Sequence, residues 1–331
     1  MDTRQLGKTG PTVSALGLGT MGMSALYGPT DREESIATVH EALDRGVTLI
    51  DTGDFYGMGH NELLVAEALR DRRREEVVIS VKFGAQRGPD GAWLGYDARP
   101  EAVKTALAYT LQRLGTDHVD IYRPARLDPA VPIADTVGAI AELIEAGWVR
   151  HVGLSEVGAD TIRRAHAVHP VSDLQIEYSL ISRGIEREIL PVCRELGIGI
   201  TAYAVLSRGL LSGHWSPDRE LGAGDFRGHS PRFRGDNLRR NLALVETLRG
   251  VATDLDASVA QVAIAWVAAQ GDEIVPLVGS RRRDQLAEAL DGSALRLGEA
   301  ELDRIEAAVP PEAVAGDRYA PEQMAMLDSE R

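Results

Sequence analysis

The stretch VVISVKFG, residues 77–84, shows the pattern that decides the fold. Its first five residues are mostly apolar and β-branched, which is typical of a short buried strand. The segment ELLVAEALRD, residues 62–71, lies before it, and EAVKTALAYTLQRLG, residues 101–115, lies after it. Both segments have the apolar period of an amphipathic helix. A strand between two helices is the repeating unit of an α/β protein.

Seven further apolar runs have the same character, at residues 14–19, 47–50, 119–122, 151–155, 173–177, 199–203 and 273–278. Eight strands that alternate with helical segments over 331 residues predict a (β/α)8 TIM barrel. We expect it to form a single domain over residues 1–331, with a doubly wound parallel sheet as the alternative fold. Thr30 and Glu33 have the spacing of a capping box at the start of the first helix.

Two long segments interrupt this alternation, at residues 84–100 and 212–237. Both are rich in Gly and Pro, and both follow predicted strands. In a barrel, the loops after the strands lie at the carboxyl-terminal face, where ligands bind. We therefore expect these long loops to form walls of the functional site.

The composition excludes several classes of protein. A formal net charge of −14 argues against nucleic-acid binding, which needs clustered Lys and Arg. The single cysteine, Cys193, is expected to be an inert core thiol, and one cysteine fits a reducing compartment. The first residues lack a signal-peptide pattern, and no apolar run has the length of a membrane span. These features predict a cytoplasmic protein that binds neither nucleic acid nor a membrane, and they leave the oligomeric state open.

Polar residues follow two predicted neighbouring strands. Asp51, Asp54 and Tyr56 lie in DTGDFYG, and Lys82 follows the apolar run of VVISVKFG. A buried lysine needs an anionic partner, which Asp51 is placed to provide. A tyrosine near the ammonium would have a lowered pKa and could donate a proton. Asp51, Tyr56 and Lys82 are thus a candidate proton-donating group. A salt bridge beside a surface tyrosine is the alternative, and Asp54 is expected to be a solvated loop carboxylate.

Seven stretches, in order along nearly the whole chain, resemble the aldo-keto reductase family: RQLGKTGPTVSALGLGTMGM, IDTGDFYG, NELLVAEALR, VVISVKFG, RHVGLSE, LQIEYSL and IVPLVGS. The resemblance implies a barrel whose base is closed by an N-terminal β-hairpin. It also implies that the protein binds NADP(H) and reduces the carbonyl of a small aldehyde or ketone by hydride transfer. In these terms Tyr56 is the general acid, Lys82 is the cation that lowers its pKa, and Asp51 pairs with that lysine.

The same resemblance implies a set of cofactor-binding residues. Ser155 and Gln175 correspond to residues that hold the nicotinamide carboxamide, and Tyr203 corresponds to the aromatic residue that stacks on that ring. Glu156 stands where many relatives have an asparagine that contacts the carboxamide. The full implied set is Thr20, Met21, Asp51, Ser155, Gln175, Tyr203, Leu206, Arg208, Gly209, Gly279, Ser280, Arg281, Gln285 and Glu288.

The segment GSRRRDQLAEAL, residues 279–290, also indicates an anion site on physical grounds. We expect Ser280 to be the N-cap of a helix, with Arg281, Arg282 and Arg283 in its first turn. Cations at this end oppose the helix dipole unless an anion binds there. A solvated basic turn is the alternative. The resemblance implies that this segment holds the adenosine 2′-phosphate, which favours NADP(H) over NAD(H).

The fourth predicted strand runs into VDIYRPARLD, residues 119–128. Ala125 stands where most relatives have a histidine that orients the substrate. Pyridoxal reductases of the family have a similar Ala-Arg-x-Asp segment, so pyridoxal is the leading substrate candidate. Other aldehydes or ketones are an alternative, and so is a catalytically weak regulatory protein that senses the cofactor. We expect the pocket to be lined by Tyr27, Phe55, Trp93 and Ala125, with Met21 and Tyr96 as further candidates.

Two arginines flank this alanine. An arginine at a strand end usually caps backbone carbonyls or pairs with a nearby acid. We expect this of Arg123 and Arg126, with Asp128 as an available acid. The alternative is that one of them points into the pocket and binds an oxygen or a phosphate of the substrate.

Overall fold

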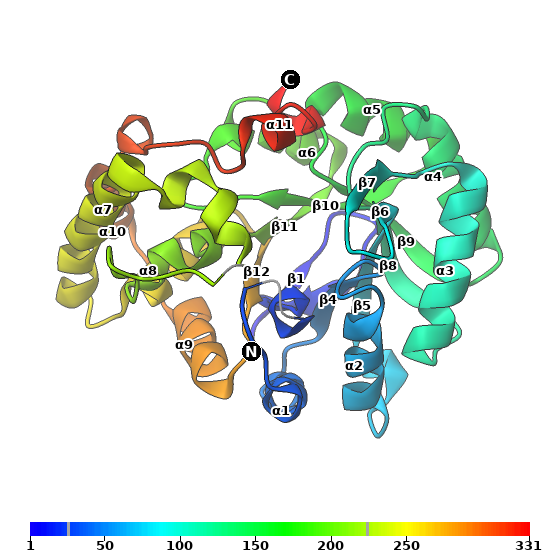
Figure 1. Cartoon of the computed structure of the whole chain (residues 1–331), viewed down its shortest axis with the longest axis horizontal. Coiled ribbons are helices and arrows are strands. Elements are labelled where there is room, and N and C mark those ends of the chain that lie inside the picture. Colours follow the sequence, from blue (N-terminus) through cyan, green and yellow to red (C-terminus); the bar gives the residue numbers. More distant parts are fainter. Residues whose placement is uncertain (25–26, 223–224) are drawn as a thin grey trace.

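The computed structural model describes residues 1–24, 27–222 and 225–331. Within these ranges eight parallel strands close into a barrel, as the sequence predicts (Figure 1). Their order around the barrel follows the chain, and β12 pairs with β3 to close it. The strands are β3 (Gly17–Gly19), β4 (Leu49–Gly53), β5 (Val78–Phe83), β8 (Val119–Pro124), β9 (Val149–Ser155), β10 (Val171–Glu177), β11 (Gly199–Tyr203) and β12 (Ile274–Gly279).

Helices surround the barrel and bury their apolar faces against it (Figure 1). The helices of the ring are α1 (Arg32–Asp44), α2 (His60–Leu69), α3 (Pro100–Leu114), α4 (Ile133–Glu145), α5 (Ala159–Val168), α6 (Ile189–Leu196), α8 (Val259–Ala269) and α9 (Arg283–Ala294). Three more are α7 (Gly235–Asp254), α10 (Glu299–Ala308) and α11 (Pro321–Met324). The expected capping box at Thr30 and Glu33 is wrong. Asp31 caps α1, because its carboxylate accepts from the backbone N–H of Glu34.

An N-terminal hairpin closes the bottom of the barrel, as the resemblance implied. It consists of β1 (Thr3–Gln5) and β2 (Thr12–Ser14), paired antiparallel. Its apolar side chains form a small separate core with residues from the lower ends of the strands, namely Leu6, Val13, Leu49, Ile121 and Val275. This apolar floor leaves the carboxyl ends of the strands as the open face of the barrel.

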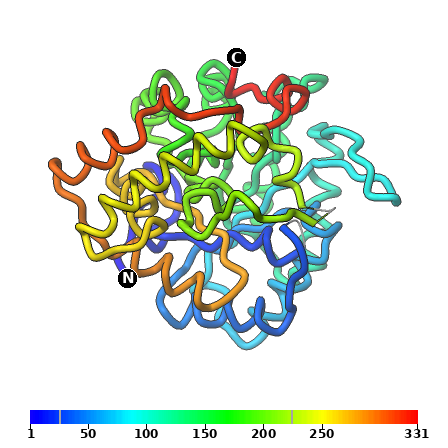
Figure 2. The backbone as a smooth tube through the Cα atoms, turned by 60° about the vertical axis from the view of Figure 1, so that its left-hand side comes forward, coloured from blue at the N-terminus to red at the C-terminus, as the bar shows by residue number. Residues whose placement is uncertain are grey.

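The two long loops lie at the open face. Residues 84–100 form a second hairpin of β6 (Ala85–Arg87) and β7 (Trp93–Tyr96), the cyan segment that projects from the body in Figure 2. The described part of residues 212–237 contains the 3-10 turns Phe226–His229 and Pro231–Phe233. Each loop therefore extends the wall around the open end of the barrel.

Gly17, Gly19 and Gly22 have the G-x-G-x-x-G spacing of a dinucleotide-binding turn, yet the closed barrel excludes the doubly wound alternative. The 3-10 turn Met21–Ser24, rather than a long helix, follows β3. Packing explains Gly17: a Cβ there would lie 2.9 Å from a methyl group of Leu49 and 3.0 Å from one of Leu277. This glycine is needed because strands crowd together, not because a phosphate approaches.

Cys193 is buried, as expected of a core thiol, and burial raises its pKa to about 12. No single helix within the described residues is long and apolar enough to cross a membrane, although α7 and α8 pass that test as a pair bent by 86°.

Candidate active site

A buried ion pair lies at the centre of the open face. Asp51 and Lys82 are near the carboxyl ends of the adjacent strands β4 and β5, and Lys82 Nζ donates to Asp51 Oδ1. Their side chains are 3% and 4% exposed, so neither charge is solvated. The other oxygen, Asp51 Oδ2, accepts from Ser80 Oγ at 2.8 Å and from Gln175 Nε2 at 2.8 Å. Both carboxylate oxygens are therefore satisfied, which is what holds a buried ion pair in place.

Tyr56 lies directly beside this pair. Its ring centroid is 5.1 Å from Lys82 Nζ, and the residue is 5% exposed. Burial, and next the charge of Asp51, raise the pKa of Tyr56 well above its ordinary value. The expected lowering of this pKa is not met here, because burial and the charge of Asp51 outweigh the effect of the nearby ammonium. The phenol stays protonated at neutral pH and is available as a proton donor.

Lys82 responds to the same surroundings. Burial lowers its pKa to about 8, although Asp51 opposes that effect. Arg123 and Arg126 add to the lowering through their positive charges. The charge of Lys82 therefore changes not far above neutral pH.

The ends of β9, β10 and β11 bring the expected nicotinamide residues together. Ser155 on β9 pairs in register with Gln175 on β10. Farther along β10, Glu177 pairs in register with Tyr203 on β11. Thr20, at the end of β3, is buried and donates to the backbone oxygen of Asp51 at 2.7 Å. The Tyr203 hydroxyl lies 2.8 Å from the hydroxyl of Tyr319, a residue that sequence reasoning did not single out.

Glu156 has a different role from the asparagine it replaces. Its carboxylate is buried and accepts two hydrogen bonds from Arg318, at 2.9 and 2.6 Å. It also accepts from the backbone N–H of Glu177 at 2.9 Å. Glu156 therefore anchors the C-terminal segment, residues 315–331. Because its oxygens already accept these hydrogen bonds, they are not free to bind the carboxamide of a nicotinamide.

Three arginines converge on a second buried carboxylate, Glu177. Arg208 lies 2.8 Å from it, Arg232 3.4 Å and Arg318 3.6 Å. Arg208 and Gly209 belong to the implied cofactor-binding set, and both have positive φ, 56° and 97°, so the chain bends sharply here. Next to Arg208, the Oγ of Ser207 is buried and has no hydrogen-bond partner within the described ranges.

The expected N-cap at Ser280 is wrong, because α9 begins at Arg283. The three arginines consequently lie apart rather than in one helical turn. Arg282 pairs with Asp284 and Arg283 pairs with Glu34. Arg281 has no acidic partner within 4.0 Å in the part of the chain that the structure describes, and donates to the carbonyls of Tyr27 and Pro29.

Gln285 and Glu288, two further residues of the implied cofactor-binding set, lie on α9 after Arg281. Gln285 Oε1 accepts from the Arg281 backbone N–H at 3.3 Å, and Glu288 accepts from Ser258 Oγ at 2.7 Å. Ser280 is 3% exposed, and its Oγ is unpartnered among the described residues. An unpartnered hydroxyl beside a cation without an acid is suited to an anion.

Both arginines at the end of β8 bond a backbone carbonyl or an acid, as expected, but neither pairs with Asp128. Arg123 is fully buried inside the barrel and pairs with Asp173 at 2.5 Å, not with Asp128. Asp128 instead accepts from the backbone N–H groups of Ala98 and Ala130. Arg126 does bond a carbonyl, that of Ala125 at 2.6 Å, but its guanidinium also reaches toward the site.

Asp54 is not the solvated carboxylate that we expected. Its Oδ1 is buried and has no hydrogen-bond partner among the described residues, and its Oδ2 lies 3.4 Å from the backbone N of Gly84. Burial, followed by the neighbouring charge of Glu62, raises the pKa of Asp54 to about 7. The loop after β4 folds back onto β5 and excludes water from this carboxyl group.

A comparison with known proteins assigns the family. The sequence profile of the aldo/keto reductase family matches residues 15–310. The chain belongs to the aldo/keto reductase family. A probable aldo-keto reductase of Glycine max is 42% identical over 318 residues, 95% of this chain and 91% of that protein. An aldo-keto reductase of Schizosaccharomyces pombe, named for NADP+, is 38% identical over 323 residues, 96% and 94% of the two chains.

Solved structures of aldo/keto reductases have the same fold. A glycerol dehydrogenase from Gluconobacter oxydans has a TM-score of 0.85 at 28% identity, covering 94% of this chain and 96% of that one. The holo form of an aldo-keto reductase from Bacillus halodurans has a TM-score of 0.77 at 28% identity, covering 94% and 97%. The open face described above is thus the carboxyl-terminal face of an aldo/keto reductase barrel.

Several aromatic side chains of this aldo/keto reductase contact one another in pairs on the loops that follow the strands. Phe55 contacts Tyr56 edge to face at 4.8 Å, and Trp93 contacts Tyr96 in the same way at 4.8 Å. Tyr27 lies to one side, with its ring 5.3 Å from the guanidinium of Arg227 and its carbonyl bonded to Arg281. This places Tyr27 beside the arginines of the adenosine side.

Sequence reasoning missed Arg227, Arg318 and Tyr319. They come from residues 212–237 and from the C-terminal segment, neither of which has a regular apolar period. Arg318 supplies a buried charge, and the adjacent Tyr319 supplies a hydroxyl at the site. Nothing in the sequence indicated that this tail reaches the open face.

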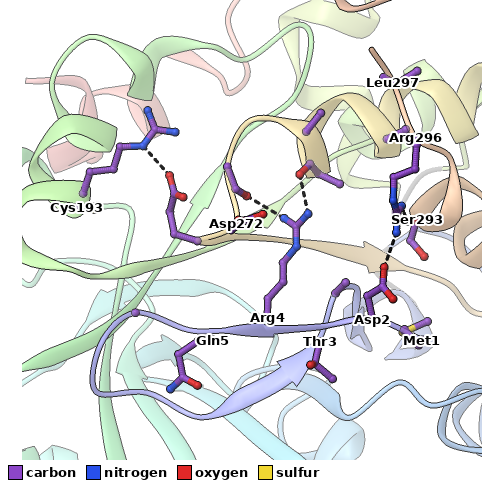
Figure 3. A pocket seen from close by; sticks show the side chains of 18 of the residues that line it. Met1, Asp2, Thr3, Arg4, Gln5, Cys193, Asp272, Ser293, Arg296 and Leu297 are labelled. Carbon is purple, nitrogen blue, oxygen red and sulfur yellow. Dashed lines mark hydrogen bonds and ion pairs between the residues drawn. The ribbon is translucent and has the colours of Figure 1, made fainter. Parts of the chain in front are cut away.

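A hollow lies at the other end of the barrel, away from the open face. It has a volume of about 1240 Å³ and is lined by the N-terminal hairpin and by residues that precede β11 and β12 (Figure 3). Two of its acids are already paired, Asp2 with Arg296 and Glu273 with Arg194. Arg4 donates to three backbone carbonyls there. Its charges thus stabilise the closed base of the barrel, far from Tyr56 and Lys82.

Proposed function

We propose that this protein is an NADPH-dependent oxidoreductase that reduces the carbonyl group of aldehydes or ketones. The observation that carries the proposal is the buried Asp51–Lys82 pair beside Tyr56 at the open face of the barrel. It is supported by family membership and by the NADP+ in the name of the yeast relative.

The residues at the open face fit NADP(H). Arg281 lacks an acidic partner among the described residues, and the buried hydroxyls of Ser207 and Ser280 have no partner in the same ranges. These are the groups that phosphates would satisfy. The residues proposed to hold the cofactor are Thr20, Met21, Asp51, Ser155, Gln175, Tyr203, Leu206, Arg208, Gly209, Gly279, Ser280, Arg281, Gln285 and Glu288.

The bound cofactor supplies the hydride, and the chain's own residues move the proton. The Tyr56 hydroxyl donates its proton to the carbonyl oxygen, as a general acid. Lys82 then compensates the charge left on the phenolate, because its ammonium lies beside the ring. Asp51 holds that ammonium in place, and the low exposure of all three residues excludes water, which strengthens these interactions.

Pyridoxal is the specific substrate that we propose. Ala125 is 2% exposed after the end of β8, and its methyl group takes less space than the imidazole of a histidine would. The neighbouring aromatic side chains of Phe55, Trp93 and Tyr96 provide faces against which a flat ring could pack. The Ala-Arg-x-Asp segment shared with pyridoxal reductases supports the same choice.

The test is NADPH oxidation with pyridoxal and a panel of other aldehydes and ketones. We expect Tyr56→Phe to lower turnover by about 10²- to 10⁴-fold while NADPH binding is retained. Tyr109→Phe is the matched control, because Tyr109 is 57% exposed on α3. Turnover that survives Tyr56→Phe would contradict the mechanism. Tight NADPH binding without turnover on any carbonyl would instead favour the regulatory alternative.

A further inference from the structure

Arg126 lies at the junction of the substrate and cofactor sides of the site. Its Nη1 donates to the carbonyl of Ala125 at 2.6 Å and lies 3.5 Å from Ser155 Oγ. Its Nη2 donates to the hydroxyl of Tyr319 at 3.3 Å. These contacts use three of the five N–H groups of a guanidinium, so two remain for another partner.

The charge of Arg126 has no counterion in the described residues. No acidic side chain there lies within 4.0 Å of its nitrogen atoms. The other arginines buried at this end of the barrel all have one: Arg208 with Glu177, Arg227 with Asp225, Arg232 with Glu177, and Arg318 with Glu156. Arg126 thus differs from these four arginines because no carboxylate pairs with it in the described residues.

Two phenols, those of Tyr203 and Tyr319, lie close to Arg126, and their hydroxyls are hydrogen-bonded to each other. Burial alone would lower its pKa, but Tyr203, Tyr319 and Glu156 together raise it above the ordinary value, so the guanidinium stays charged. Of these, Glu156 is already occupied by Arg318. A half-buried cation that faces a site without a paired anion costs free energy in the empty protein. Such a cost is expected where a ligand supplies the missing charge.

We propose that Arg126, together with the hydroxyl of Tyr319, binds an oxyanion carried by the carbonyl substrate, either a carboxylate or a phosphate monoester. The inference rests on the proposed carbonyl reduction, and it favours an anionic aldehyde or ketone over pyridoxal, which carries neither of these anions. A guanidinium presents paired N–H groups that match the two oxygens of such an anion.

The position of Arg126 indicates a binding role rather than proton transfer. Its hydrogen bonds run toward β9 and the C-terminal segment, whereas Tyr56 and Lys82 project from the β4 and β5 side. It is nevertheless close enough to influence the pKa values of both Tyr56 and Lys82. A substrate whose carbonyl contacts Tyr56 can therefore extend its anionic end to Arg126.

The experiment compares aldehydes that differ in charge. 4-Formylbenzoate, its methyl ester and 4-formylphenyl phosphate are reduced with NADPH by the wild type, Arg126→Met, Arg126→Lys and the control Arg99→Met. Arg99 is a suitable control because its side chain is 67% exposed and already paired with Asp97. We expect Arg126→Met to lower kcat/KM about 10- to 100-fold for an anionic aldehyde and less than about threefold for the ester.

Whether Arg126→Met changes KM or kcat distinguishes anion binding from an action on the carbonyl. An anion-binding residue remote from the reacting carbon changes KM more than kcat, and Arg126→Lys should restore part of the affinity. Whichever of the carboxylate and the phosphate shows the larger loss identifies the anion. An equal fall in kcat for the ester and the anionic aldehydes would overturn the proposal, because Arg126 would then act on the carbonyl.

A binding measurement tests the oxyanion site independently of carbonyl reduction. Calorimetric titration of terephthalate into the protein with NADP+ present should show binding that Arg126→Met weakens and Arg99→Met retains. If neither aldehyde class is reduced, the proposed function fails, while this loss of binding would still support the oxyanion site. The oxyanion site would be refuted if the wild type and Arg126→Met bound terephthalate equally and had the same preference for anionic aldehydes over the ester.

Discussion

Lys82 is the residue through which pH should control the reaction. Its pKa is lowered to about 8, chiefly by burial. Below that pH the ammonium is present and can stabilise the Tyr56 phenolate, and above it the charge is lost. The Tyr56 hydroxyl keeps its proton throughout this range, because its own pKa is raised. The two shifts together make the lysine the titrating member of the pair.

We therefore expect kcat for carbonyl reduction to fall as pH rises through about 8. The measurement is a pH profile of NADPH oxidation at saturating substrate. In Lys82→Arg the cation does not titrate in this range, so any residual activity should be flat. A wild-type rate that stays constant from neutral pH to well above the lysine pKa would contradict this role for Lys82.

Ala125 should determine how large a substrate fits. The residue is 2% exposed, so Ala125→His adds an imidazole to a space already bounded by packed side chains. We expect kcat/KM for ring-bearing aldehydes, relative to small ones, to fall by about tenfold or more. Ala130→His is the control, because Ala130 is exposed on the same loop. An unchanged ratio would mean that Ala125 does not border the pocket.

At the scale of elements, the C-terminal segment is fastened to the barrel by one arginine. Arg318 is 7% exposed and pairs with Glu156, Glu177 and Glu330. The start of α5 adds a further contact, because the backbone N–H of Gly158 donates to Asp328 at 2.8 Å. These contacts hold Tyr319 against Tyr203, so the tail completes a wall of the active site.

We expect Arg318→Met to destabilise the protein by about 3–5 kcal/mol, because it leaves buried carboxylates without a counterion. Thermal or denaturant unfolding measures this, and Arg304→Met should have little effect, since that arginine and Asp254 are 48% and 62% exposed. A similar small effect for both variants would show that Arg318 does not anchor the tail.

The ion pair of Arg318 with Glu156 predicts that stability depends on pH. Burial by itself would raise the pKa of Glu156, but Arg318 overcomes this and the pKa lies well below its ordinary value. The ionised Glu156 carboxylate therefore stabilises the folded protein above the ordinary pKa of a glutamate. This stabilisation is lost as pH falls toward the pKa of Glu156 in the folded protein. The difference in melting temperature between wild type and Arg318→Met should shrink accordingly as the solution is acidified.

For the whole molecule, cofactor binding should raise stability, because a ligand that binds only the folded state stabilises it. At 100 times its Kd the gain is about 2.7 kcal/mol. We expect NADPH to raise the melting temperature more than NADH at equal concentration, because Arg281 has no acid within 4.0 Å among the described residues. Arg281→Met should narrow the difference, whereas Arg282→Met, whose arginine is paired with Asp284, should retain it. Equal shifts for the two cofactors would contradict the assignment of Arg281.

Local pattern predicted the barrel well, because a strand or helix expresses its periodicity within a few residues. The predicted strand at residues 199–203 matches β11, and the run at residues 119–122 is found in β8 with two further residues. Predictions at element ends were poorer. The caps at Thr30 and Ser280 were wrong by one and by two positions, because residue types identify a helix better than they locate its first residue.

The sequence by itself determined the eight alternating strands, the floor hairpin and the placement of Asp51, Tyr56 and Lys82 at strand ends, because parallel strands deliver their carboxyl ends to one face. Only the tertiary structure decided which charges meet. Arg318 reaches Glu156 across 162 positions, and Arg123 enters the barrel to pair with Asp173. Arg126, with the same side chain three residues later, is left with no carboxylate partner in the described residues. Partner choice depends on distances through space, which no local pattern encodes.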